Sequence, residues 1–193
     1  MLPNTKKRNA AIALVIGVLL IAAATIITWL QTSQQENIEW DVTLIGSSGE
    51  ITLAYDEIRA LPHYEGRGGF FTSVGYINGP YQLRGIPILE LCDLVGGITS
   101  SDIIFISAED GYSTVLDYQQ VTGDFITYDP DTMMEVPHGE LELILMYELD
   151  NRIPSPEEGR PLRLAIAGEE DLLTEGLFWV KWVKRIEVMP KQN

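Results

Sequence analysis

The longest hydrophobic run in the sequence lies near its beginning, where residues 10–30 contain no charged side chain. About 21 residues in a helix, rising about 1.5 Å each, reach across the roughly 30 Å hydrocarbon core of a bilayer. A Lys-Lys-Arg triplet at positions 6–8 precedes the run, and the next charge after it is Glu36. Because basic residues stay on the cytoplasmic side, the pattern predicts a cytoplasmic N-terminus (residues 1–9), a transmembrane signal anchor (residues 10–30) and a translocated remainder.

Cleavage of this leader as a signal peptide is the competing interpretation. Three alanines at positions 22–24 are small enough for a signal peptidase. The hydrophobic run continues past them to Leu30, which is longer than a usual signal-peptide core and favours an uncleaved anchor. Residues 31–39 are mostly polar and aperiodic, and we expect them to be a linker between the anchor and the rest of the chain.

From Trp40 onward the pattern changes to short segments in which hydrophobic and polar residues alternate, as is typical of half-buried strands. The first two segments are separated by Gly-Ser-Ser-Gly at positions 46–49, which predicts a hairpin. The other predicted strands cover residues 70–74, 103–107, 113–116, 141–149, 162–167 and 180–188. In the last of these, Val180, Trp182, Ile186 and Val188 are expected to share one face.

Helices are predicted to be few and short. One covers residues 56–61 and ends at a proline, and another follows Pro87 and ends at Gly96. Asp117 is a possible N-cap for a third. The glycine-rich residues 65–69 predict a mobile loop. Together these elements predict an α+β fold, mostly β with mixed sheets, in one domain over residues 40–189 with a tail at 190–193.

The negative charge of the chain argues against one class of binding partner. There are 28 Asp and Glu against 13 Lys and Arg, a formal net charge of −15, and three of the basic residues belong to the leader. So acidic a domain repels phosphate backbones, which argues against a nucleic-acid partner. The only cysteine, Cys92, excludes an intrachain disulfide and lies on the hydrophobic stripe of its helix, where we expect a buried structural thiol.

Motifs for a metal site are missing from the sequence. His63 and His138 are the only histidines, and neither belongs to an HExxH or CxxC pattern, so no zinc site is predicted. The acidic clusters at 129–135 and 169–171 lack an EF-hand pattern and are interpreted as solvated loops. The sequence has neither a glycine-rich phosphate loop that opens a helix nor a GxSxG motif.

Basic residues of the domain are concentrated in its last third: Arg160, Arg163, Lys181, Lys184 and Arg185. Two interpretations stay open. The cations could hold a small anion, or they could pair with the surplus carboxylates on the surface.

Four stretches of residues 40–189 together resemble the sulfite-oxidase-like, molybdopterin-binding oxidoreductase domain. They are LAYDEIRALP from Leu53, RGIPILELCDLVGG from Arg84, EDGYSTVLD from Glu109, and a C-terminal pair, LMYELDNRIPSPEEGRPLRLAIAG and FWVKWVKRIEV. The pair is the most specific, because family members similarly carry a tyrosine-glutamate strand, an acidic-proline turn, a PxR strand and a VKW strand in this order.

The resemblance implies a pterin cofactor that carries molybdenum, with basic residues on its phosphate and a cysteine thiolate on the metal. By position, the PxR arginine is Arg163, the VKW lysine is Lys181 and the glycine that ends the PxR strand is Gly168. The metal-ligand cysteine is replaced by Ser73. A hydroxyl is a hard donor with a very high pKa and does not substitute for a thiolate in such coordination, so no metal ligand is assigned.

Three functions follow from the resemblance as expectations. The first is a membrane-anchored, extracytoplasmic, molybdopterin-binding, oxidoreductase-like domain without ordinary molybdenum catalysis, which holds a small anionic ligand. The second is an active molybdopterin oxidoreductase that exchanges electrons with a membrane carrier. The third is an accessory subunit of a membrane redox complex. The leader has no Arg-Arg pair, which argues against export of a folded, cofactor-loaded enzyme by the twin-arginine route.

Overall fold

The computed structural model describes residues 38–191. The predicted N-terminus (1–9), signal anchor (10–30) and most of the linker therefore lie outside the described residues, as do the last two residues of the tail. Within residues 38–191, no helix combines the length and the hydrophobicity that a bilayer crossing requires.

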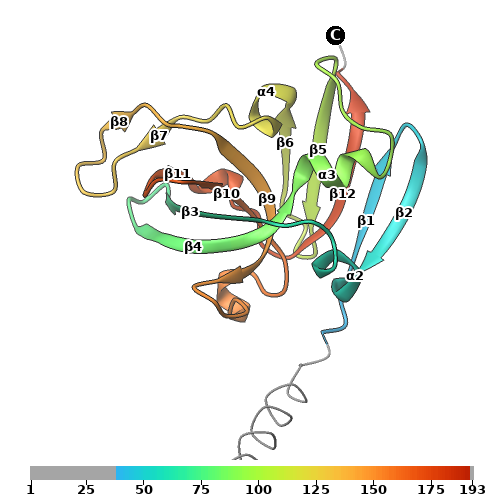
Figure 1. Ribbon diagram of the computed structural model, residues 1–193, viewed down its shortest axis with the longest axis horizontal. Coiled ribbons are helices and arrows are strands. Elements are labelled where there is room, and N and C mark those ends of the chain that lie inside the picture. Colours follow the sequence, from blue (N-terminus) through green and yellow to red (C-terminus); the bar gives the residue numbers. More distant parts are fainter. Residues whose placement is uncertain (1–37, 192–193) are drawn as a thin grey trace, which may run out of the picture. The chain divides into compact units, whose positions relative to one another are not determined.

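A five-stranded sheet contains the first and the last strand of the described chain (Figure 1). The predicted hairpin is confirmed, because β1 and β2 pair antiparallel across the turn at 46–49. β1 also pairs in parallel with β12, and β12 pairs antiparallel with β5. The order is β2 (Gly49–Ala54), β1 (Asp41–Gly46), β12 (Val183–Pro190), β5 (Asp102–Ala108) and β6 (Ser113–Asp117).

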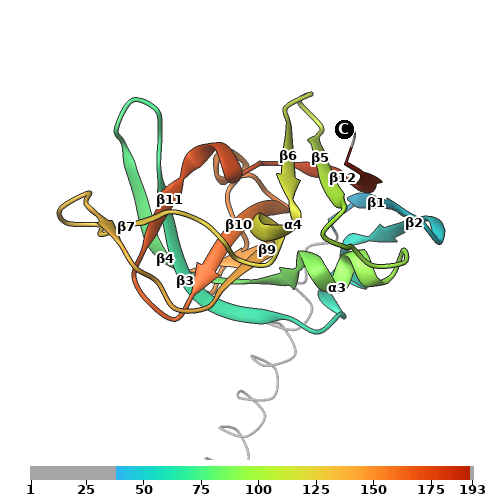
Figure 2. The same cartoon turned by 90° about the horizontal axis from the view of Figure 1, so that it is seen from above.

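A second sheet of seven strands lies beside the first (Figures 1 and 2). Its order is β10 (Arg163–Gly168), β9 (Leu141–Leu149), β4 (Ile77–Pro87), β3 (Tyr64–Phe71), β11 (Leu173–Glu175), β7 (Thr127–Tyr128) and β8 (Glu135–Val136). An additional pairing between Gly168 of β10 and Arg67 of β3 joins two strands that are not neighbours in this order. The strands β3, β4, β9 and β10 thus form a closed ring.

The helical elements of the described chain are short: α2 (Tyr55–Arg59), α3 (Ile88–Asp93), α4 (Tyr118–Val121), η1 (Pro156–Glu158) and η2 (Gly176–Phe178). Pro87 is the N-cap of α3, close to its predicted place in the first turn. Asp117 caps α4 as predicted, since its Oδ1 accepts a hydrogen bond from the Gln120 backbone N–H at 3.0 Å. The fold is mostly β with a few short helices, in agreement with the α+β prediction.

Two hydrophobic clusters share β9 and β10. Alternate residues of β9 point to opposite sides, so that Leu143 and Leu145 belong to the larger cluster and Ile144 and Met146 to the smaller one. The larger cluster packs β9 and β10 against the five-stranded sheet and α3. Cys92 is part of it with 1% of its surface exposed, which confirms the prediction of a buried thiol.

The prediction of a mobile loop at residues 65–69 is wrong, because these residues belong to β3. Their glycines let β3 approach its neighbours closely. A Cβ added to Gly68 would lie 2.2 Å from the carbonyl oxygen of Ile166 in β10, and one added to Gly66 would lie 2.7 Å from the carbonyl oxygen of Gly168. Close approach of the backbones, and not flexibility, requires glycine here.

The predicted strand at 180–188 also differs from the structure. β12 begins only at Val183, because Trp182 adopts a φ of 55° and the register of β12 against β5 shifts between Val183 and Arg185. Val183 and Ile186 are buried, whereas Trp182 turns out of the predicted face. The predicted strand at 70–74 ends at Phe71, and the long strand β4 was not predicted.

Candidate functional site

A cleft of about 540 Å³ opens between the end of the β3–β4 hairpin, the β5–β6 turn and the segment that leads into β12. Thirteen residues line it: Phe70, Thr72, Ser73 and Asn78 from the hairpin, Asp110 and Tyr112 from the turn, Arg163 from β10, and Gly176, Leu177, Trp179, Val180, Lys181 and Trp182 from the last segment. Aromatic side chains and two cations are the main features of this lining.

Arg163 is a buried cation at the start of β10. Only 5% of its surface is exposed, and its guanidinium carbon lies 4.5 Å from the ring centre of Phe70 and 5.4 Å from that of Trp179. One Nη1–H donates to the carbonyl oxygen of Glu158 at 3.0 Å. Its Nε has no hydrogen-bond partner among the described residues. Burial lowers the pKa of Arg163 to about 10, so the side chain is still charged at neutral pH.

Lys181 is the second cation of the cleft and lies close enough to Arg163 for their charges to interact. Burial and the charge of Arg163 lower the pKa of Lys181. Its Nζ donates to the carbonyl oxygen of Glu157. None of the ion pairs between residues 38 and 191 includes Arg163 or Lys181. The two cations therefore contact backbone carbonyls and aromatic rings, and no side-chain carboxylate of residues 38–191 forms an ion pair with them.

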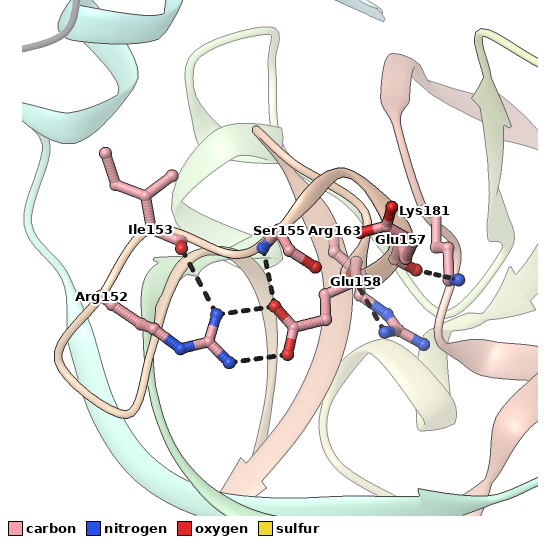
Figure 3. A network of polar contacts seen from close by, with 7 residues as sticks. All are labelled: Arg152, Ile153, Ser155, Glu157, Glu158, Arg163 and Lys181. Atoms are coloured by element: carbon pink, nitrogen blue, oxygen red, sulfur yellow. Dashed lines mark hydrogen bonds and ion pairs between the residues drawn. The ribbon is translucent and has the colours of Figure 1, made fainter.

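A network of polar contacts around η1 holds these carbonyls in place (Figure 3). Arg152 donates two parallel hydrogen bonds to the Glu158 carboxylate, at 2.6 and 2.7 Å, and the Ser155 backbone N–H donates to the same group at 2.6 Å. The hydrogen bonds from Arg152 are the main reason why the pKa of Glu158 falls to about 2. The side chain of Glu158 thus fixes the turn, and its backbone carbonyl positions Arg163.

Three of the four residues assigned by resemblance meet in the cleft. Ser73, Arg163 and Lys181 come from separate parts of the chain, and all three line it. Gly168 does not, because it lies at the other end of β10, where a Cβ would approach Leu141 Cδ2 to 2.7 Å. Its lack of a side chain therefore serves packing. Cys92 is also outside the cleft, and burial raises the pKa of its thiol to about 12.

The surface-pairing interpretation holds for other cations of the last third. Lys184 donates to Asp41 at 3.2 Å, and Arg185 pairs with Glu187 at 2.6 Å. No group of three or more histidine, cysteine, aspartate and glutamate side chains gathers as a metal site in the part of the chain that the structure describes. Sequence reasoning missed Asp110 as a site residue, although Asp110 belongs to the EDGYSTVLD stretch that carries part of the resemblance.

No protein-family model matches the chain, and no curated protein matches its sequence. Its structure is similar to that of the sulfane dehydrogenase SoxCD from Paracoccus pantotrophus, with a TM-score of 0.58 and 15% sequence identity over 79% of this chain. The likeness shows a shared fold. This chain covers 38% of the sulfane dehydrogenase chain, so well under half of that protein has a counterpart here.

Proposed function

We propose that the domain is a molybdopterin-binding, oxidoreductase-like module that holds the anionic end of its ligand with Arg163 and Lys181 and lacks ordinary molybdenum catalysis. The observation that carries the proposal is the buried guanidinium of Arg163, with a free Nε, beside Lys181 in a cleft of about 540 Å³. The resemblance in sequence and the shared fold with a dehydrogenase support the oxidoreductase-like assignment.

The energetics of Arg163 favour an anionic ligand. Burying a cation without a counter-charge costs several kcal/mol, and a donor without a partner adds about 1–3 kcal/mol. A phosphate or carboxylate in the cleft would relieve both costs, because it would supply a charge and an acceptor for the Nε–H. Tyr112 and Trp182 line the cleft without being buried, and their rings offer flat apolar surface for an aromatic ligand body.

The residues fit the organic part of such a cofactor and do not fit a thiolate-ligated metal. The cleft lining contains no thiol, and Ser73 is an exposed hydroxyl on the turn between β3 and β4. Cys92 belongs to α3 and lies within the larger hydrophobic cluster. The cleft therefore supplies no thiolate that could ligate a metal.

The proposal includes the place of the domain in the cell. The uncharged run at 10–30 and the Lys-Lys-Arg triplet before it support a single-pass anchor in the cell membrane with the domain outside the cytoplasm. A small anionic ligand or a membrane redox partner would then meet the cleft outside the cytoplasm. The shared fold with a dehydrogenase favours, as a second candidate, an active oxidoreductase or a redox-complex subunit.

A measurement of the cofactor content of the native protein distinguishes these candidate functions. The full-length chain is purified from its own host, and released pterin fluorescence and bound molybdenum or tungsten are measured per chain. We expect pterin near one per chain, little metal, and loss of the pterin in Arg163→Met. Arg67→Met is the matched control, because Arg67 forms an exposed ion pair with Asp171 away from the cleft.

Three other outcomes of this measurement would contradict parts of the proposal. Pterin and metal both near one per chain would overturn the non-catalytic proposal in favour of the active enzyme. Absence of pterin from the native protein would overturn the cofactor assignment. Equal loss of pterin in Arg163→Met and Arg67→Met would show that Arg163 does not hold it.

A further inference from the structure

Asp110 brings a negative charge into a cleft whose other charged groups are cations. It lies on the β5–β6 turn and lines the cleft together with Arg163 and Lys181. Its charge acts on Lys181, where it opposes the lowering of the lysine pKa by burial and by Arg163. The two side chains nevertheless form no ion pair within 4.0 Å. The carboxylate and the cations are therefore separate binding elements of one cleft.

The turn that carries Asp110 is fixed to the opposite wall of the cleft. The backbone N–H of Glu109 donates to the carbonyl oxygen of Trp182 at 2.9 Å, and the Tyr112 hydroxyl donates to the carbonyl oxygen of Leu177 at 3.1 Å. Asp110 Oδ1 accepts a hydrogen bond from the Tyr112 backbone N–H at 3.0 Å. Its Oδ2 accepts no hydrogen bond from any residue that the structure describes, which leaves one oxygen of a positioned carboxylate available.

We propose that Asp110 determines which anions the cleft accepts, by receiving a hydrogen bond from an N–H group of the ligand. The ligand class is an organic anion with two distinct ends: an acidic group held by Arg163 and Lys181, and a planar nitrogen heterocycle or amine whose N–H faces Asp110. A simple anion contacts only Arg163 and Lys181. A ligand with a second acidic group in place of the N–H is repelled by the Asp110 carboxylate. This inference rests on the proposed function, because it assumes that the cleft binds an organic anion.

Two probes that differ in their N–H groups test the assignment. 6-Carboxypterin and 2-naphthoate both carry a carboxylate on a flat bicyclic ring, but only the pterin has N–H donors. Their affinities are measured by calorimetry on the full-length chain, made in a host that cannot synthesise molybdopterin. We expect the wild-type protein to bind 6-carboxypterin roughly tenfold more tightly than 2-naphthoate, as one charge-assisted hydrogen bond allows.

Asp110→Asn should remove that preference while leaving 2-naphthoate binding equal or tighter. Asparagine keeps the oxygen that accepts from Tyr112, so the turn should persist, and a melting curve checks this. Glu109→Gln is the matched control, because Glu109 is the neighbouring acid and does not line the cleft. If the wild-type and Asp110→Asn proteins prefer 6-carboxypterin over 2-naphthoate by the same factor, Asp110 does not select the ligand. The cleft would then remain an anion site without a role for Asp110. Failure of the wild-type protein to bind either probe would overturn the proposed function and this inference together.

Discussion

Replacement of Glu158 by glutamine tests whether the polar network around η1 stabilises the domain. Glutamine keeps the size of the side chain and the backbone carbonyl that positions Arg163, but it removes the charge that Arg152 contacts with two hydrogen bonds. The change therefore isolates the ion pair. Glu157→Gln is the matched control, since only the backbone carbonyl of Glu157 takes part in the network and both variants reduce the net charge of −15 equally.

The magnitude follows from the pKa of Glu158, which falls from 4.5 to about 2. If the whole shift in pKa acted on folding, it would contribute on the order of 3 kcal/mol of stability. The side chain of Arg152 is 50% exposed, and solvent screening of such a pair reduces the value to about 1 kcal/mol. Because the folded state lowers the pKa, the stabilisation is fully present above pH 4.5 and is lost as the pH falls toward 2.

Urea unfolding followed by circular dichroism measures this difference. At pH 7, Glu158→Gln should be less stable than Glu157→Gln by about 1 kcal/mol. The difference should shrink to less than half by pH 3. Equal stability of the two variants at pH 7, or a difference that is the same at pH 7 and pH 3, would refute the reasoning.

Three further substitutions or modifications test the packing of the domain. Cys92 should resist iodoacetamide at pH 8 until urea unfolds the protein, because burial raises its pKa to about 12; labelling of the folded protein, detected by mass spectrometry, would contradict this. Gly68→Ala should lower the free energy of unfolding by about 2 kcal/mol, since its methyl group would meet a backbone carbonyl at 2.2 Å, whereas Gly139→Ala has open space and should be neutral. Leu83→Ala should cost about 3 kcal/mol in urea unfolding, because Leu83 is fully buried. Leu94→Ala, at 44% exposure, should cost under about 0.5 kcal/mol, and equal losses in the two leucine variants would argue against the described core.

Local pattern was sufficient to predict elements whose partner is nearby in sequence. The β1–β2 hairpin follows from alternation on both sides of a glycine-serine turn, and the cap of α4 follows from Asp117. The sequence of β3 contains glycines at 66, 68 and 69, which is typical of a loop when only local preference is considered. The real cause at Gly66 and Gly68 is the backbone of β10, far away in the sequence, and no local pattern contains that information. Gly69 instead lies against Asn78 of β4 and Leu173 of β11.

In the candidate site, too, some residues could be predicted from the sequence and one could not. Arg163 and Lys181 were assigned by resemblance to a family motif, whereas the distribution of charge alone favoured pairing with surface carboxylates, as it occurs at Lys184. Asp110 was missed because an Asp-Gly pair is ordinary in a turn. Its place in the cleft depends on the contact between that turn and Trp182, which forms only in the folded domain.

The position of β12 affects how the domain is made. β12 is the last strand in the described chain, yet it lies in the middle of the five-stranded sheet, between β1 and β5. On the ribosome, the β1–β2 and β5–β6 hairpins emerge long before the strand that joins them. Each hairpin therefore exposes an unpaired edge during synthesis, which is a hazard for aggregation. The five-stranded sheet is therefore completed only after Val183–Pro190 has been released.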